Sequence, residues 1–212
     1  MRLASKAITA IVFFVVSMGS VTAQDTEPKL PSPEQIRQLY REASANWHTT
    51  PPVATQAFVA AEDRFFYERS VGSSTITQQV GSWYLLPGAG RLQRIAFARV
   101  IGEELSHKEV LDWFVNQVFL GQTCFGVFDA AATYFGIAVR DLNLEQAAYL
   151  AALPKSPALF HPVQSYERAV ERRNFVLNEM QRAGFISADE AQRAIQSDLA
   201  VKEPLGRCEM DQ

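Results

Sequence analysis

The chain has 212 residues and a formal net charge of −3; 48% of its residues are hydrophobic and 20% are charged. This composition is typical of a globular protein, and the slight acidity without any basic block excludes a nucleic-acid binder. The two cysteines and three scattered histidines have no spacing typical of a metal site.

The first 23 residues have the form of a secretory signal. Arg2 and Lys6 precede the apolar run 7–16, and small residues close the segment at Ala23. A membrane-spanning helix needs about 20 apolar residues, so this run is short for a span. We therefore predict export with cleavage near Ala23, and an uncleaved N-terminal anchor is the alternative.

The rest of the chain is predicted to form one domain. Residues 24–33 are a proline-rich linker, residues 34–200 are long enough for a single packed core, and residues 201–212 form a tail. An oxidising compartment would allow Cys124 and Cys208 to pair. The sequence does not show whether their Cα atoms lie within bridging distance, so the paired and the free states both stay open.

Capping signals predict helices along the whole domain. Helix starts of the capping-box kind occur at Ser32, Ser106, Asn143 and Ser187. Residues 167–182 carry apolar side chains at helical spacing between charged ones. No hairpin signal and no convincing alternation of a strand is present. The predicted fold class is therefore mostly α.

The strongest chemical signal is the adjacent carboxylate pair Glu62 and Asp63. The pair follows the small apolar segment 57–61 and precedes the aromatic residues 65–67. Burial beside apolar rings and a close second carboxylate disfavour the charged form, which is the usual origin of a general acid or base near neutral pH. A helix end beside a core face would carry the same residues, so a structural role is the alternative.

A segment rich in neutral hydrogen-bonding groups follows the carboxylate pair. Its candidate substrate-binding side chains are those of Ser74, Thr75, Thr77, Gln78 and Gln79. Hydroxyls and amides at this density suit a sugar or a phosphate. The structural alternative is an N-cap at Ser73 or Ser74 that opens a helix running to Leu86.

These two stretches carry a resemblance. Glu62-Asp63-x-x-Phe66 and Gly72-x-Ser74-Thr-Ile-Thr-Gln-Gln79 resemble the first two motifs of the family 51 glycosyltransferases. In penicillin-binding proteins and monofunctional transglycosylases, this domain polymerises lipid II into peptidoglycan. The later stretches 109–116, 147–157 and 172–177 are similar to its remaining motifs, so the resemblance covers about residues 51–186.

The resemblance implies a lysozyme-like, two-lobed helical domain with the active cleft between the lobes. Glu62 takes the part of the general base, Asp63 holds it in place or tunes its pKa, and the segment from Ser74 to Gln79 lines the donor or acceptor side. Arg91 or Arg94 faces the substrate pyrophosphate.

The resemblance also implies partners and a location. The substrates are lipid II and the growing glycan strand, met at a membrane surface alongside other cell-wall synthesis proteins. A divalent metal, Mg or Mn, binds at the substrate pyrophosphate, and the protein alone forms no metal site. The location is the periplasm or the outer face of the cytoplasmic membrane.

Three departures from the family pattern affect the donor side. Arg69 replaces a histidine, and Ser70–Val71 replaces a much longer connection between the first two motifs. Ser82 stands where the family has a lysine, which would pair with the leaving pyrophosphate. Neither Arg94 nor Ala98, the two aligned positions, supplies the family's second glutamate.

These departures leave two alternatives to a polymerising enzyme. One is a catalytically degenerate module that binds lipid II or glycan, or that serves as a scaffold. The other is a lysozyme-like hydrolase, which needs two acids at a defined separation across a cleft. Adjacent Glu62 and Asp63 give no such separation.

We expect Glu62 to line the largest cleft and to face residues 74–79, because the short connection between the two stretches leaves little chain to separate them.

Overall fold

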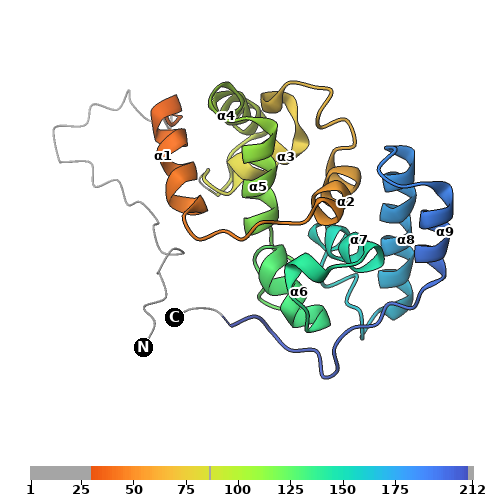
Figure 1. Cartoon of the computed structure of the whole chain (residues 1–212). Helices are drawn as coiled ribbons and strands as arrows, with labels where there is room; N and C mark the ends of the chain where they lie inside the picture. The colour runs from red at the N-terminus through yellow and green to blue at the C-terminus, as the bar shows by residue number, and fades with distance from the viewer. Residues whose placement is uncertain (1–29, 86, 210–212) are drawn as a thin grey trace, which may run out of the picture.

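A computed structural model describes residues 30–85 and 87–209 (Figure 1). The helices are α1 (Pro33–Ser44), α2 (Pro52–Glu62), η1 (Val71–Ser73), α3 (Thr75–Ser82), α4 (Arg91–Glu104), α5 (His107–Gln117), α6 (Val127–Phe135), η2 (Val139–Asp141), α7 (Leu144–Ala152), η3 (Leu153–Lys155), α8 (Tyr166–Arg182) and α9 (Ala188–Gln196). In these ranges the chain forms no strand, and Phe119 and Phe125 make an isolated antiparallel bridge. The prediction of a mostly α fold is confirmed.

The N-terminal predictions fall outside this part of the chain. The signal of residues 1–23 and the linker residues 24–29 lie outside the described residues. Among the helices that are described, none combines the length and the apolar character needed to cross a bilayer.

The four predicted capping boxes are confirmed. The side chains of Ser32, Ser106, Asn143 and Ser187 accept hydrogen bonds from backbone N–H groups in the first turns of α1, α5, α7 and α9. In each case the third helical residue bonds back to the backbone of the cap residue. Such reciprocal caps satisfy N–H groups that a helix start leaves unpaired, which explains why local sequence located these starts.

The helix after the carboxylate pair is shorter than predicted. Ser74 caps α3, and the helix ends at Ser82 instead of continuing to Leu86, which is not among the described residues. The next two side chains turn toward α5: Trp83 stacks on Phe114 at 5.8 Å, and Tyr84 meets Trp113 edge-on at 5.3 Å. Packing of these rings outweighs the local helical pattern.

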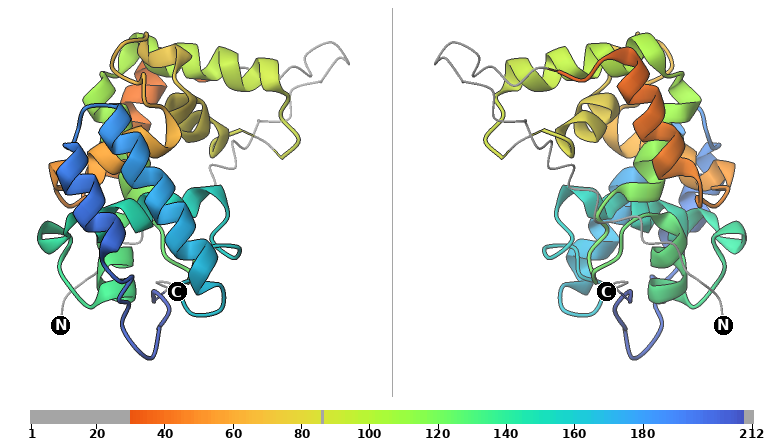
Figure 2. Two further views of the ribbon diagram at one scale, coloured as in Figure 1. Left: turned by 90° about the vertical axis from the view of Figure 1, so that its right-hand side faces the viewer. Right: turned by 90° about the vertical axis from the view of Figure 1, so that its left-hand side faces the viewer.

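The helices form two groups joined by α5 (Figures 1 and 2). In one group α1 and α3 pack against α4, and in the other α2, α8 and α9 pack around α7. α7 is buried on all sides over residues 147–152, four of which are alanines, so its neighbours can approach closely. Helix α5 contacts α1 and α3 on one side and α2 and α6 on the other. This arrangement is the predicted two-lobed one.

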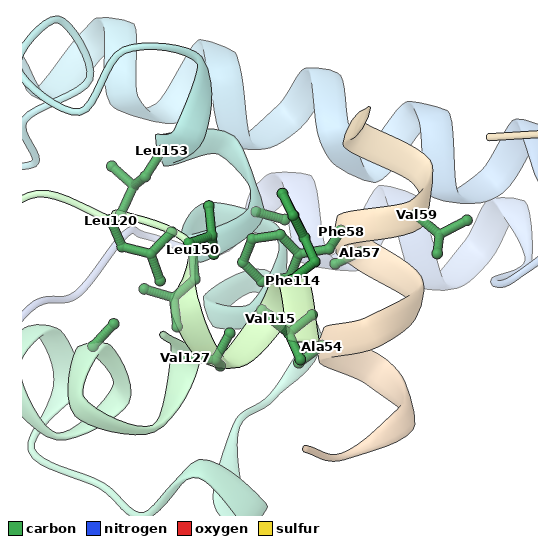
Figure 3. Packing of buried hydrophobic residues seen from close by; sticks show 14 of the residues in the cluster. Ala54, Ala57, Phe58, Val59, Phe114, Val115, Leu120, Val127, Leu150 and Leu153 are labelled. Atoms are coloured by element: carbon green, nitrogen blue, oxygen red, sulfur yellow. The ribbon is translucent and has the colours of Figure 1, made fainter. Parts of the chain in front are cut away.

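Aromatic and aliphatic side chains from several helices form the core between α2, α5 and α7 (Figure 3). The rings of Phe58 on α2 and Phe114 on α5 meet edge to face with centroids 5.9 Å apart. Leu150 on α7 is fully buried beside them. This packing fixes the direction of α2, whose last residue is Glu62.

The segment after α9 is anchored, although it was predicted as a tail. The backbone N–H of Lys202 donates to the carbonyl of Tyr134 on α6 at 2.7 Å. Cys124 and Cys208 form a disulfide with a Cα–Cα distance of 5.0 Å, which decides the question that the sequence left open. Residues 201–208 therefore return to the body of the domain.

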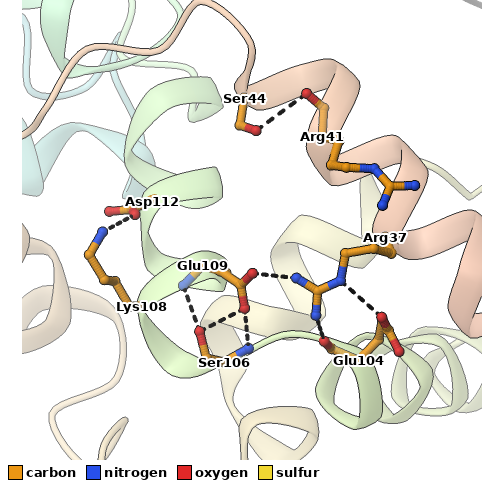
Figure 4. A network of polar contacts seen from close by, with 8 residues as sticks. All are labelled: Arg37, Arg41, Ser44, Glu104, Ser106, Lys108, Glu109 and Asp112. Carbon is orange, nitrogen blue, oxygen red and sulfur yellow. Dashed lines mark hydrogen bonds and ion pairs between the residues drawn. The ribbon is translucent and has the colours of Figure 1, made fainter.

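A polar network around Arg37 attaches α1 to the junction of α4 and α5 (Figure 4). The Arg37 Nε donates to the Glu104 carboxylate at 2.9 Å, and the same guanidinium bonds the Glu104 carbonyl and the Glu109 carboxylate. Burial acts to raise the pKa of Glu109, but hydrogen bonds from Ser106 and the charge of Arg37 outweigh it and hold the pKa below the ordinary 4.5.

We expect this network to make stability depend on pH. Glu109→Gln keeps a capping amide but removes the charge, and should lower the free energy of unfolding by about 1 kcal/mol at neutral pH. Because the folded-state pKa of Glu109 is depressed, its contribution is present above about 4.5 and is lost as the pH falls through the folded-state value. Urea unfolding at neutral and acidic pH measures the difference.

The matched control for this prediction is Glu171→Gln, which changes an exposed carboxylate on α8. That variant should match the unchanged protein at both pH values. A difference between Glu109→Gln and the unchanged protein that persists undiminished at acidic pH would contradict the assignment.

Two glycines bring the connection between α2 and α3 directly against α4. An added Cβ at Gly102 would lie 2.2 Å from the backbone N of Gly72. A Cβ at Gly72 would lie 2.8 Å from the Cα of Arg99. Backbone therefore contacts backbone here, and no larger side chain fits at either position.

We predict that Gly102→Ala destabilises the protein by about 1–3 kcal/mol, although alanine is the better helix former. The new methyl group must displace the backbone of η1, which cannot move without shifting α3. Thermal unfolding compares this variant with Gly206→Ala, whose Cβ would meet nothing within 4 Å. Equal stability of the two variants would show that the contact is not tight in solution.

Candidate active site

The carboxylate pair lies where α2 ends. Glu62 is the last residue of the helix, and Asp63 leaves the helical conformation with φ −158° and ψ 82°. The N–H of Asp63 still donates to the carbonyl of Val59 at 2.9 Å. Asp63 is buried, whereas Glu62 is partly exposed, so the two adjacent acids occupy different environments.

Glu62 faces the start of α3. The Nε2 amide of Gln79 donates to Glu62 Oε2 at 2.8 Å, and the Thr75 hydroxyl donates to the Glu62 carbonyl at 2.9 Å. The other carboxylate oxygen, Oε1, has no hydrogen-bond partner among the described residues. Glu62 is therefore oriented by a neutral amide and keeps one oxygen available to accept a proton.

Asp63 is held more firmly than its neighbour. Its Oδ2 accepts the backbone N–H of Thr75 at 3.1 Å, at the first residue of α3. Its Oδ1 lies 3.6 Å from the Nε of Arg69. An acid at a helix N-terminus is favoured by the helix dipole. Asp63 thus ties the end of α2 to the beginning of α3.

The predicted substrate-binding segment divides into two sets. Ser74 is fully buried and caps the helix through Ile76 N–H at 3.0 Å, and buried Thr77 donates to the Val71 carbonyl at 2.6 Å. Both side chains are engaged in local structure. Thr75 and Gln79 contact Glu62, and the partly exposed Gln78 lies between them in sequence.

The two arginines predicted to face the pyrophosphate make no contact with the carboxylate pair among the described residues. Arg91 and Arg94 lie in the first turns of α4, and both are exposed. The start of α4 projects from the body of the molecule (Figure 2), and Leu92 beside them is 81% exposed. No hydrogen bond or ion pair connects either arginine with Glu62 or Asp63 in the part of the chain that the structure describes.

Arg172, in the stretch 172–177 that resembles a family motif, lies on α8 and was not among the predicted site residues. The Arg172 guanidinium stacks on Phe175 at 4.5 Å, and its Nε is buried without a hydrogen-bond partner. Burial lowers the pKa of Arg172, while the carboxylates of Glu62 and Glu179 act in the opposite direction. Arg172 therefore lies within electrostatic reach of Glu62.

Its neighbour Arg173 has a structural role. The Arg173 side chain is fully buried. It donates to the carbonyls of Ser197 at 2.8 Å and Ile195 at 3.2 Å, at the end of α9. Charge alternation along α8 could not reveal this, because the partners come from a helix much later in the chain.

The prediction about the cleft is only partly confirmed. Glu62 faces Thr75 and Gln79, as expected. One pocket beside α1 and another of about 750 Å³ near the C-terminus are not lined by Glu62. That Glu62 lines the largest cleft stays a prediction, and the structure gives its site a defined hydrogen-bond pattern.

The described residues do not fit a metal held by protein side chains. Within residues 30–85 and 87–209, no three His, Cys, Asp or Glu side chains gather at one position. Helix α4 carries two acids that could replace the family's second glutamate. Glu103 is exposed, and Glu104 bonds to Arg37. We therefore derive the chemistry below from side chains that the chain supplies itself.

Comparisons with known proteins agree with this geometry. Residues 68–181, more than half of the chain, match the family model "Transglycosylase". Penicillin-binding protein 1A of Neisseria flavescens is 32% identical over 91% of this chain and 28% of its own length. The Aquifex aeolicus protein of the same name is 36% identical over 72% of this chain and 24% of its own length.

The Escherichia coli penicillin-binding protein 1A is 36% identical over 66% of this chain and 19% of its own length. The chain thus spans about a quarter of the length of these curated relatives. The crystal structure of penicillin-binding protein 1A from Haemophilus influenzae superposes with a TM-score of 0.50 at 28% identity, covering 72% of this chain and 17% of that one. The chain belongs to the transglycosylase family.

Proposed function

We propose that this protein is a peptidoglycan glycosyltransferase that polymerises lipid II into glycan strands. Family membership supports the reaction class, and the contact between Gln79 and Glu62 is the observation that carries the assignment. This contact orients the Glu62 carboxylate and leaves its Oε1 available to accept a proton. The same proposal places the chain outside the cytoplasm, at the periplasmic face of the membrane that holds the substrate.

The reaction needs one proton acceptor and one leaving group. The 4-hydroxyl of a lipid II sugar attacks the anomeric carbon of the lipid-linked strand, and Glu62 accepts the hydroxyl proton. The bond from that carbon to the pyrophosphate oxygen breaks, and polyprenyl pyrophosphate leaves with the electron pair. Asp63 acts as a positioning residue, because it fixes the α2–α3 corner that carries Glu62.

Neutral groups beside Glu62 are suited to hold sugar. The Thr75 hydroxyl and the Gln78 amide lie on the same short helix as Gln79. Buried Ser74 and Thr77 support this helix start and contribute to the site through the backbone they hold. Arg172 adds positive charge within reach of Glu62, although it lies on α8.

The leaving-group side has fewer charged partners. Ser82 carries no charge and donates its hydroxyl to the Gln79 carbonyl at 2.6 Å. Arg91 and Arg94 lie at the projecting start of α4. Stabilisation of developing charge is commonly the larger catalytic contribution. We therefore propose slow polymerisation, while a module that only binds lipid II or glycan is the alternative that finds less support in an enzyme family.

One prediction of the proposed function concerns Glu62 as the general base. Purified protein incubated with fluorescent lipid II should form glycan chains that separate by electrophoresis. Glu62→Gln keeps the hydrogen bond from Gln79 but cannot accept a proton, so the rate should fall by about 10²–10⁴. Glu68→Gln, which changes an exposed acid in the following turn, should retain the full rate. Undiminished polymerisation by Glu62→Gln would remove Glu62 from the mechanism.

Another prediction of the proposed function concerns the pyrophosphate leaving group. Ser82→Lys introduces a cation one turn after Gln78, where it can pair with pyrophosphate. Turnover should rise by about tenfold or more, since single stabilising donors are commonly worth more than this. Ser82→Met is the matched control, because it adds similar length without charge. An equal effect of lysine and methionine would show that packing, and not charge, limits the rate.

A further inference from the structure

A second site lies away from the carboxylate pair. A cavity of about 750 Å³ is formed by three separate stretches, 119–122, 157–164 and 203–207. Its volume is in the range of small-ligand sites, and no residue between 62 and 79 lines it. The third wall lies beyond residues 68–181, which the family model matches, so the cavity is built partly by this chain's own C-terminal segment.

Residues 121–123, of which Gly121 and Gln122 line the cavity, are called its floor below and have an uncommon backbone conformation. Gly121, Gln122 and Thr123 have φ values of 79°, 50° and 60°, so three consecutive residues are left-handed. A β-branched threonine rarely adopts such a conformation, and residues like this persist where the surroundings hold them, often at binding sites. A side chain at Gly121 would place its Cβ 2.9 Å from the Cβ of Pro157, so this floor also touches the second wall.

The C-terminal segment supplies the restraint. The Cys208 N–H donates to the Gln122 carbonyl at 2.8 Å, and the Thr123 hydroxyl donates to the Cys208 carbonyl at 2.6 Å. The disulfide of Cys208 with Cys124 closes the same corner. The strained floor and the third wall are thus one covalently closed unit.

The polar lining is ordered on one side and unpaired on the other. Nδ1 of His161 accepts the N–H groups of Val163 and Gln164 at 3.2 and 3.1 Å, and its Nε2 lies 2.9 Å from the Gln122 amide. The imidazole is therefore fixed. On the third wall, Glu203 and Arg207 are exposed and form no ion pair among the residues that the structure describes.

The combination of charges restricts the ligand. One free acid and one free base on the same wall, with Phe119 and Leu205 as apolar surface, match a short peptide that carries both a carboxylate and an ammonium group. A neutral sugar needs neither charge. A phosphate group would be opposed by Glu203.

We propose that this cavity binds the peptide branches of the glycan strand, with the peptide carboxylate at Arg207 and the ammonium group at Glu203. That the peptide comes from the cell wall rests on the proposed function. That the ligand is a peptide with both a carboxylate and an ammonium group rests only on the residues that line the cavity. Binding here would hold the strand at a second point while Glu62 acts on its sugar end.

Calorimetry on the full chain tests the proposal with three soluble probes: a disaccharide-peptide from peptidoglycan, its free peptide, and the disaccharide alone. The first two should bind at this cavity, whereas any binding of the disaccharide, at the neutral groups beside Glu62, should not depend on Arg207. Arg207→Gln should weaken peptide binding about tenfold, the loss expected for a charge-assisted bond. Arg140→Gln, which removes another exposed arginine, should leave binding unchanged.

Two further variants keep the test decisive. Glu62→Gln should bind the peptide normally, so failure of polymerisation and failure of peptide binding are separate results. Replacing both Cys124 and Cys208 by alanine should weaken binding because it frees the third wall, with folding checked by circular dichroism. No binding of either peptide probe, full affinity of Arg207→Gln for the peptide, or a loss of disaccharide binding in Arg207→Gln as large as the loss of peptide binding would overturn the proposal.

Discussion

The site depends on one hydrogen bond between the end of one helix and the start of the next. Asp63 accepts the Thr75 N–H, which turns the chain back within a few residues and sets Glu62 against Gln79. The Gly72 to Gly102 contact allows this turn because it lets η1 lie directly on α4. Without both features the acid and the amide that orients it would lie on separate surfaces.

Local sequence predicted those parts of the fold that local interactions decide. Ser106 and Glu109 lie three residues apart and satisfy each other's backbone groups, so their capping box is visible without any tertiary structure. The contact of Glu62 with the segment after Ser74 was also predictable, because the connection leaves little chain to separate them. The resemblance supplied the two-lobed arrangement, which periodicity alone could not.

The parts that the sequence did not show depend on distant partners. Arg91 and Arg94 stay predictions for the pyrophosphate, and the direction of α4, which carries them, is set by packing against η1 and α3. Arg172 belongs to a stretch that resembles a family motif, but only the approach of α8 to α2 brings it near Glu62. Burial and long-range pairing are properties of the assembled fold, so a single sequence does not show them.

Arg173 has a consequence for how the domain comes apart. Its guanidinium is fully buried and donates to the carbonyls of Ile195 and Ser197 at the end of α9 and to the side-chain oxygen of Asn174. Detachment of α9 alone would remove two of these three acceptors from a charged group, which costs more than the loss of neutral hydrogen bonds. Helices α8 and α9 therefore open as one cooperative unit, and fraying of the C-terminal region stops at this arginine.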